Sequence, residues 1–208
     1  MHRSGYPISP RPTNFRVGAI LLSRSDSDPT FAEDTILSTG YTMELAGNTH
    51  AEQCCLANFA SVHGVADEDV GSALPATPRH SLVMYVTMEP CGKRLSGNTP
   101  CAARLAATRN AGRGIQKVYF GVKEPGTFVG ESVGCAMLSE AGIEWEYVSG
   151  FEKEILEVAF AGHENPAREV EEALEGIRVE REKAEEKKRE EAPRNPKKRM
   201  MEGETLLY

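Results

Sequence analysis

Apolar positions along the chain form short runs that alternate with stretches of helical spacing. The runs predict strands at residues 17–22, 35–39, 82–86, 118–122 and 143–148. The helical stretches predict helices at residues 50–62, 101–111, 131–141 and 151–160. This order of elements predicts an α/β fold with three α/β/α layers, in which a mixed five-stranded sheet has helices on both faces.

Residues at the ends of the predicted helices indicate where the helices start and stop. Asn48 or Thr49 is expected to cap the helix that begins at His50. Gly112 is expected to end the next helix. Strand ends and helix starts that meet at one end of an open sheet commonly hold its functional site, so we expect the site there.

Composition divides the chain into three parts. Residues 1–12 contain three prolines and predict an irregular arm, and residues 13–163 hold all the predicted strands. From residue 164 the composition changes, and a dense mixture of Glu, Lys and Arg predicts a charged helix over 168–191 followed by a tail to 208. A thin apolar stripe on this helix leaves three arrangements open: docking on the domain, docking on a partner, or a free helix.

The net charge and the hydropathy of the chain limit the kinds of partner and the cellular location that we expect. The 208 residues carry a net charge of −7, which argues against a nucleic-acid partner. No apolar run approaches the roughly 20 residues that span a bilayer, so we expect no membrane segment. The N-terminus lacks the apolar segment of a secretory signal, and the five cysteines suit a reducing compartment. We therefore expect a cytoplasmic protein, while the basic residues at 197–199 leave a nuclear signal open.

Three short motifs carry the chemistry. His50-Ala51-Glu52 is followed by Glu89-Pro90-Cys91 and then by Pro100-Cys101. Each motif alone is ordinary, since an isolated Pro-Cys is usually a buried thiol. In this order they supply one imidazole and two thiolates for zinc, with a glutamate two residues after the histidine. The H-x-E…P-C…C order is the signature of zinc-dependent deaminases of nucleobase-like rings.

The residue types fit such a reaction. Zinc bound by His50, Cys91 and Cys101 would lower the pKa of water to about 7 and so make hydroxide available. Glu52 could then move protons as general base and general acid, provided that burial raises its pKa above the usual value of about 4.3. Pro100 precedes a predicted helix start, which favours the thiolate form of a ligand cysteine. The remaining thiols are expected in the core; they are Cys54, Cys55 and Cys135.

Nine residues separate the two ligand cysteines, whereas nucleoside and tRNA deaminases usually have two. The chain resembles the pyrimidine deaminases of riboflavin biosynthesis over roughly residues 12–163. The segments that carry the resemblance are 14–18, 48–52, 87–91, 97–101 and 121–125. Residues 94–97 and 123–129 are most similar to the fungal branch, whose enzymes act on a ribitylamino pyrimidine, whereas bacterial enzymes act on the ribosylamino form.

The resemblance implies a cytidine deaminase-like fold, one Zn²⁺ per subunit and a homodimer. It implies that 2,5-diamino-6-ribitylamino-4(3H)-pyrimidinone 5′-phosphate loses its 2-amino group as ammonia. Asn14 is expected to hydrogen-bond the ring or the ribityl chain. Residues of the long loop between the two ligand cysteines (92–100, the metal loop) are expected to hold the phosphate or the ribityl hydroxyls. The expected substrate-binding residues are Asn14, Asn48, Lys93, Arg94, Asn98, Thr99 and Lys123, with Phe128 as a weaker candidate.

Three alternatives stay open at this point. The same chemistry could act on the ribosylamino form, because no single residue distinguishes the two sugars. A nucleoside or tRNA deaminase is a second alternative, although it needs a basic groove and aromatic platforms for flipped bases. The third is a silent deaminase-fold subunit that scaffolds a partner. Such proteins typically lose the proton-moving glutamate, whereas Glu52 is present.

Overall fold

Five strands form one sheet in the order β2-β1-β3-β4-β5. The computed structural model describes residues 14–76, 78–109, 113–124 and 132–191. β1 runs antiparallel to both β2 and β3, whereas β4 runs parallel to β3 and β5, so the sheet is mixed as predicted. The strands are β1 (Gly18–Ser25), β2 (Thr35–Tyr41), β3 (His80–Met88), β4 (Ile115–Val122) and β5 (Glu144–Tyr147).

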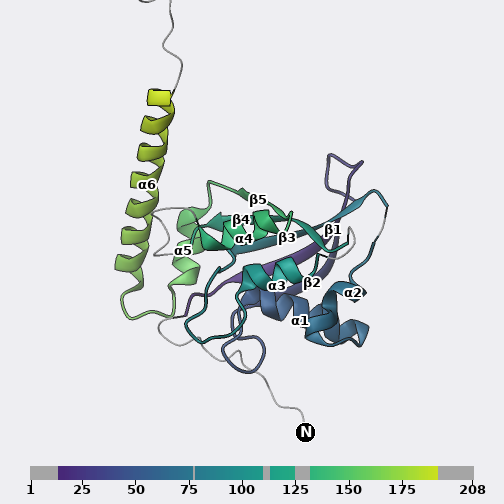
Figure 1. Cartoon of the computed structure of the whole chain (residues 1–208). Helices are drawn as coiled ribbons and strands as arrows, with labels where there is room; N and C mark the ends of the chain where they lie inside the picture. Colours follow the sequence, from purple (N-terminus) through teal and green to yellow (C-terminus); the bar gives the residue numbers. More distant parts are fainter. Residues whose placement is uncertain (1–13, 77, 110–112, 125–131, 192–208) are drawn as a thin grey trace, which may run out of the picture.

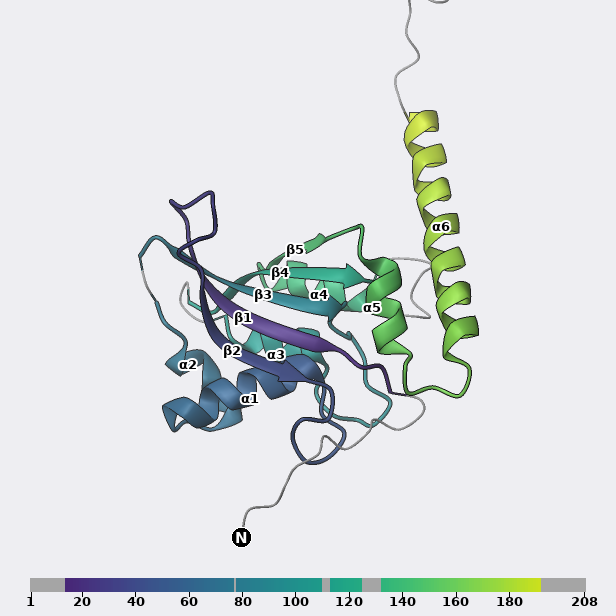
Figure 2. The same ribbon diagram turned by 180° about the vertical axis from the view of Figure 1, so that it is seen from behind.

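Helices lie on both faces of this sheet, which confirms the predicted three-layer α/β/α fold. Figure 1 shows α1, α3 and α4 in front of the sheet, and Figure 2 shows the same sheet from behind, with α5 and α6 beside it. The helices are α1 (Ala51–His63), α2 (Val70–Ala73), α3 (Cys101–Ala107), α4 (Val133–Glu140), α5 (Glu152–Ala159) and α6 (Pro166–Glu191), with a 3₁₀ turn at Asp67–Asp69.

The main core lies between the sheet and the layer of α1, α3 and α4. Large apolar side chains from the strands and these helices meet there with no exposed surface; they include Leu21, Met84, Val118, Leu105 and Leu138. Burying each such side chain stabilises the fold by about 1.5–3 kcal/mol. Gly40 of β2 lies against the backbone of α1, where a Cβ would come within 2.2 Å of the Cys55 nitrogen. This contact leaves no room for a side chain and brings α1 close to the sheet.

The start of α1 differs from the prediction. His50 occupies the N-cap position, and neither Asn48 nor Thr49 caps the helix with its side chain. The Asn48 side chain instead accepts a hydrogen bond from the Asn14 amide at 3.1 Å, and the Thr49 hydroxyl donates to the Leu45 carbonyl at 3.0 Å. Both side chains are therefore hydrogen-bonded to the N-terminal segment or to the preceding loop. Local sequence patterns do not predict such contacts.

The helix after Cys101 is shorter than predicted. α3 ends at Ala107 with Thr108 as C-cap, and the predicted end at Gly112 lies outside the described residues. The Thr108 hydroxyl donates to the Leu105 carbonyl at 2.7 Å and accepts from the Ile115 amide at 3.2 Å. These bonds satisfy the end of the helix and join it to the start of β4, so the chain leaves the helix early.

α6 docks on the domain through its N-terminal half. Val170, Ala173 and Ile177 are buried in a second apolar cluster that includes Leu156 and Phe160 of the neighbouring segment. Polar contacts continue to Glu180 and Arg181, and the last turns of α6 extend past the domain, as both ribbon views show (Figures 1 and 2). Of the three arrangements that the sequence allowed, docking on the domain describes α6 as far as Arg181. The predicted arm at 1–12 and the tail after 191 lie outside the described residues.

None of the described helices combines the length and the hydrophobicity needed to cross a bilayer. α6 is long enough, but its surface alternates between acidic and basic residues. Several of these side chains pair along the helix, as in Arg178 with Glu175 and Glu182 at 2.6 and 2.7 Å. Such exposed pairs contribute little to stability, so the docked apolar stripe is the main anchor of the helix.

Candidate active site and metal centre

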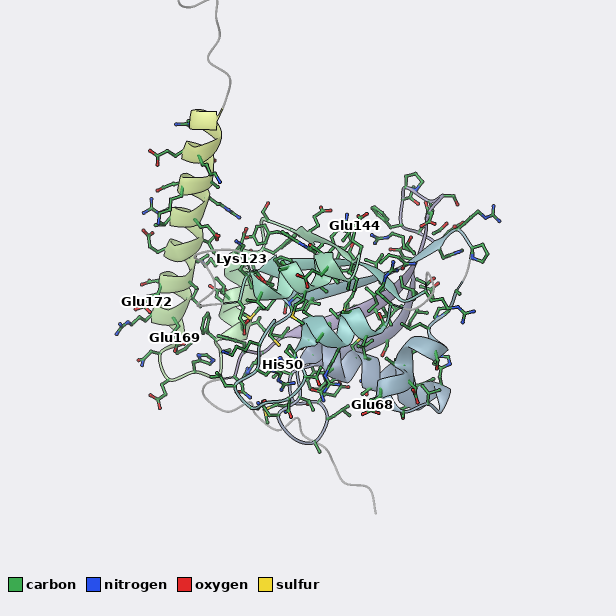
Figure 3. The ribbon with its side chains drawn as sticks, viewed as in Figure 1. His50, Glu68, Lys123, Glu144, Glu169 and Glu172 are labelled. Atoms are coloured by element: carbon green, nitrogen blue, oxygen red, sulfur yellow. The ribbon has the colours of Figure 1, made fainter. Side chains whose placement is uncertain are left out.

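His50, Cys91 and Cys101 come together at one end of the sheet, although the first and the last are 51 positions apart in the sequence. The His50 Nδ1 atom lies 3.5 Å from each of the two sulfurs. All three candidate ligand atoms lie within 4.8 Å of one another. Figure 3 labels His50 on the side of the domain where the loops near α1 gather. The trio therefore forms a compact cluster from three separate segments.

The start of a helix or the end of a strand positions each of the three residues. His50 directly precedes α1, and Cys91 lies three residues after the end of β3. Cys101 is the first residue of α3, and its backbone N–H donates to the Cys91 sulfur at 3.4 Å. The next amide, that of Ala102, donates to the Cys91 carbonyl at 3.1 Å. The start of α3 thus holds Cys91 by two backbone hydrogen bonds.

The geometry and charge of the trio fit zinc. Tetrahedral zinc with typical Zn–S and Zn–N bonds places sulfur and nitrogen about 3.5 Å apart. A hydrogen bond from the Cys101 thiol, together with His50, lowers the pKa of Cys91 to about 4. The Cys101 thiol is the other half of this pair, and its pKa is raised because it holds the shared proton next to Cys91. Three protein ligands leave a fourth position for water, as in catalytic zinc sites.

Glu52 lies beside the two sulfurs, in the first turn of α1. Its side chain is buried, with 3% of the residue exposed. Burial raises the pKa of this carboxyl to about 7, and it interacts with the Cys101 side chain. A carboxyl with such a pKa can both accept and return a proton near neutral pH, which is what a general acid–base catalyst needs. The expectation that Glu52 is a buried carboxyl is therefore met.

A cavity of about 290 Å³ opens beside the trio. It is lined by His50, Glu52 and Cys91, and by the apolar residues Phe15, Val17 and Met88. The other lining residues are Asn14, Thr42, Asn48, Glu89, Lys93, Arg94, Leu95, Ser96 and Glu124. The cavity therefore combines the candidate metal centre with an apolar wall and a polar rim, the usual composition of a small-molecule site.

Four of the predicted substrate-binding residues line this cavity: Asn14, Asn48, Lys93 and Arg94. Arg94 is buried, and its guanidinium donates to the Gln53 side chain at 3.1 Å and to the backbone carbonyl of Asn48. Its Nε atom is also buried and makes no hydrogen bond. Arg94 thus connects the metal loop to the start of α1, and its Nε–H remains as a donor without a partner in the described residues.

The other predicted substrate-binding residues lie elsewhere. Asn98 and Thr99 belong to the exposed part of the metal loop and are not among the residues that line the cavity. Lys123 forms an ion pair with Glu180 of α6, with 2.6 Å between Nζ and Oε1. Phe128 lies outside the described residues.

Two carboxyls at the cavity were not among the predicted site residues. Glu124 lines the cavity, and its burial raises its pKa to about 7. Glu89 is buried beside it, where burial raises its pKa and the Cys135 thiol donates to Oε1 at 3.7 Å. A signal for Glu124 was available: it follows β4 as Cys91 follows β3, and the carboxyl ends of parallel strands meet at one edge of a sheet.

The other three thiols are free and buried, as predicted for core cysteines. Burial raises the pKa of Cys55 and of Cys135 to about 12. These two thiols are therefore protonated at neutral pH, in contrast to Cys91. The difference separates Cys91 from the structural cysteines by environment as well as by motif.

Comparison with known proteins agrees with this site. The family model for the cytidine and deoxycytidylate deaminase zinc-binding region matches residues 8–122. The diaminohydroxyphosphoribosylamino-pyrimidine deaminase of Schizosaccharomyces pombe is 31% identical over 154 residues, which cover 74% of this chain and 32% of that protein. The chain therefore spans about a third of the length of that relative.

Solved structures give a more extensive match. The Rib2 deaminase of Aspergillus oryzae, a C-terminal deletion mutant at pH 6.5, is 61% identical with a TM-score of 0.74, covering 83% of this chain and 91% of that one. The same enzyme in complex with DARIPP is 62% identical with a TM-score of 0.74 and the same coverage. The chain belongs to the cytidine and deoxycytidylate deaminase family, in the group that contains the Aspergillus oryzae Rib2 deaminase.

Proposed function

We propose that the protein catalyses the hydrolytic deamination of 2,5-diamino-6-ribitylamino-4(3H)-pyrimidinone 5′-phosphate (DARIPP) in riboflavin biosynthesis. The product is the 5-amino-6-ribitylamino-pyrimidinedione phosphate. The observation that carries the proposal is the buried Glu52 beside the His50, Cys91 and Cys101 cluster, at a cavity of small-molecule size. The complex of the 62% identical Aspergillus oryzae enzyme with DARIPP supports the choice of substrate.

The reaction replaces an exocyclic amine by oxygen. A water oxygen bonds to C2 of the ring, the bond from C2 to the 2-amino nitrogen breaks, and ammonia leaves. Zinc held by His50, Cys91 and Cys101 supplies a Lewis acid that activates water near neutral pH. Neither oxidant nor reductant is needed, because the carbon keeps its oxidation state.

Glu52 moves the protons of this reaction. In the first half its carboxylate takes a proton from the attacking water and gives it to a ring nitrogen next to C2. In the second half it takes the remaining hydroxyl proton and gives it to the 2-amino nitrogen, which leaves as ammonia. The pKa of about 7 that burial gives Glu52 suits both directions of transfer.

The cavity walls would orient the substrate. The apolar residues Phe15, Val17 and Met88 provide surface for the pyrimidine ring, and Asn14 and Asn48 provide side-chain amides. Lys93 and Arg94, in the metal loop, provide positive charge for the 5′-phosphate or donors for the ribityl hydroxyls.

Two expectations from the resemblance belong to the same proposal. We expect the ribitylamino form to be preferred over the ribosylamino form, and we expect a homodimer in the cytoplasm. Light scattering after size exclusion measures the mass in solution against the 22.7 kDa of one chain. A monomeric active enzyme would remove the dimer from the proposal and leave the chemistry intact.

The direct test is ammonia release by purified, zinc-loaded protein. DARIPP, its ribosylamino counterpart, cytidine and tRNA would be compared, with Glu52→Gln as the inactive control. Fast release from DARIPP that the variant loses supports the proposal. Release from the ribosylamino compound alone would keep the chemistry and change the substrate, whereas release only from cytidine or tRNA would overturn the proposed function.

A further inference from the structure

α6 shares an apolar cluster with the ends of β3 and β4, the two strands that lead into the active site. Its buried residues Val170, Ala173 and Ile177 share an apolar cluster with Met88 and Val122. Met88 ends β3 and lines the cavity, three residues before Cys91. Val122 ends β4. The apolar face of α6 therefore supports the two strand ends from which the active site is built.

The two strand ends are also bonded to each other. The Glu89 N–H donates to the Val122 carbonyl at 2.8 Å. The next residues along the chain are Lys123 and Glu124, of which Glu124 lines the cavity. A displacement of the segment after β4 would therefore reach both the cavity wall and the backbone just before the ligand Cys91.

An ion pair joins α6 to this segment. Lys123 Nζ lies 2.6 Å from Glu180 Oε1, and the two side chains are 29% and 31% exposed. Figure 3 labels Lys123 between α6 and the sheet. The pair is thus one residue away from the cavity wall at Glu124, on the side that faces α6.

Arg181, the residue after Glu180, attaches this part of α6 to the domain. Arg181 bonds to the Glu152 carboxylate and lies 3.2 Å from the Tyr147 hydroxyl, which itself donates to Glu152 at 2.7 Å. These groups belong to β5 and α5, so α6 is attached to the domain next to the ion pair. Glu180 is therefore presented to Lys123 by a fixed stretch of helix and not by a fraying end.

We propose that Glu180 is a positioning residue for the deaminase: through Lys123 it holds the segment with Glu124 in place and so shapes the cavity for substrate binding. α6 is then part of the catalytic unit, although none of its residues lines the cavity. The kinetic side of this inference rests on the proposed function. Its structural side, the placement of Lys123 and Glu124 after β4, does not.

The test compares Glu180→Gln with Glu182→Gln on the same helix. Glu182 is a matched control because it pairs with Arg178 of the same helix at 2.7 Å, with 62% of its side chain exposed. We expect Glu180→Gln to raise KM for DARIPP about threefold to fivefold, the size of a partly exposed ion pair, with kcat within about twofold. Zinc content and Tm of both variants should stay close to those of the wild type.

A double-mutant cycle gives a sharper outcome. Lys123→Met should raise KM by as much as Glu180→Gln, and the double variant by no more than either single one, because all three lack the same pair. Lys123→Arg keeps the charge and should restore a KM close to the wild-type value. Equal KM values in Glu180→Gln and wild type, or equal effects of Glu180→Gln and Glu182→Gln, would overturn the inference.

Hydrogen–deuterium exchange provides a readout that needs no substrate. Amides in residues 118–124 should exchange faster in Glu180→Gln than in Glu182→Gln and the wild type. If the wild type fails to release ammonia from either pyrimidine phosphate, the proposed function fails, and this comparison alone decides the positioning role. Unchanged exchange in that case would overturn it.

Discussion

The metal centre and the metal loop lie side by side, yet they are built in opposite ways. Cys91, Cys101 and Glu52 have at most 4% of their surface exposed, and backbone amides at the start of α3 hold the first of them. The loop between the cysteines is mostly exposed and reaches 99% exposure at Leu95. Its described backbone bond, from the Gly97 N–H to the Arg94 carbonyl, is local. The candidate metal centre is thus held by the scaffold, whereas most residues of the loop face solvent.

Arg94 connects the two regions. It is the buried charged residue of the loop, and its guanidinium bonds to Gln53 of α1 and to the Asn48 carbonyl. Its neighbours in the loop, Lys93 and Leu95, face solvent. The comparison therefore predicts large effects for changes at the centre, intermediate effects at Arg94 and small effects at the exposed loop residues.

The largest effect is expected when a zinc ligand is removed. Cys101→Ser should lower bound zinc from one per chain to near zero and abolish ammonia release, because zinc binding requires the thiolate. Cys135→Ser is the matched control: it changes a buried thiol whose hydrogen bond to Glu89 a hydroxyl can also make. Metal analysis and Tm measure both variants. Full zinc in Cys101→Ser would contradict the assigned ligand set.

Glu52→Gln should separate metal binding from proton transfer. The variant keeps the volume of the buried side chain but cannot carry a proton, so kcat should fall by roughly 10²–10⁴. Bound zinc and Tm should be those of the wild type within error. Steady-state kinetics with metal analysis checks both parts, and a variant that keeps more than a tenth of the wild-type kcat would remove Glu52 from the mechanism.

Arg94→Ala should have an intermediate effect. It removes the bonds to Gln53 and Asn48 as well as charge at the cavity rim, so KM should rise roughly tenfold, which corresponds to about 1.4 kcal/mol. Arg94→Lys should recover little, because an ammonium cannot reproduce the forked contacts of a guanidinium. Lys93→Ala is the comparison variant, because it removes only a positive charge at the cavity. A larger KM change in Lys93→Ala would reverse the ranking of the two cations.

Leu95→Ala should have the smallest effect. The side chain is 99% exposed, so its truncation should leave Tm unchanged and KM within about twofold. Thermal melting and initial rates over a range of DARIPP concentrations measure this. A tenfold rise in KM would show that Leu95, which lines the cavity, contacts the bound substrate.

The sequence predicted the centre better than its surroundings. His50, Glu52, Cys91 and Cys101 form local motifs whose spacing reflects the order of strands and helices, so both the fold class and the cluster followed from pattern alone. The cap of α1 did not follow, because Asn48 bonds to Asn14, which lies 34 residues away.

The docking position of α6 and the ion-pair partner of Lys123 could not be predicted from the sequence either. Lys123 and Glu180 are 57 residues apart, and a lysine beside an active-site motif is as compatible with a phosphate contact as with an ion pair. The apolar stripe of α6 indicates that the helix docks, but not where. Such long-range pairings depend on how the elements pack, which hydrophobic periodicity does not specify.

The most direct test of the account is the origin of the new oxygen in the product. Zinc-loaded enzyme would convert DARIPP in water enriched in ¹⁸O, and mass spectrometry would follow the pyrimidine product while ammonia is measured in parallel. The account predicts one ¹⁸O atom in the product and one ammonia per turnover, both abolished by a chelator and by Glu52→Gln. Ammonia release without ¹⁸O in the product, or turnover that survives the loss of zinc, would contradict hydrolysis at this centre.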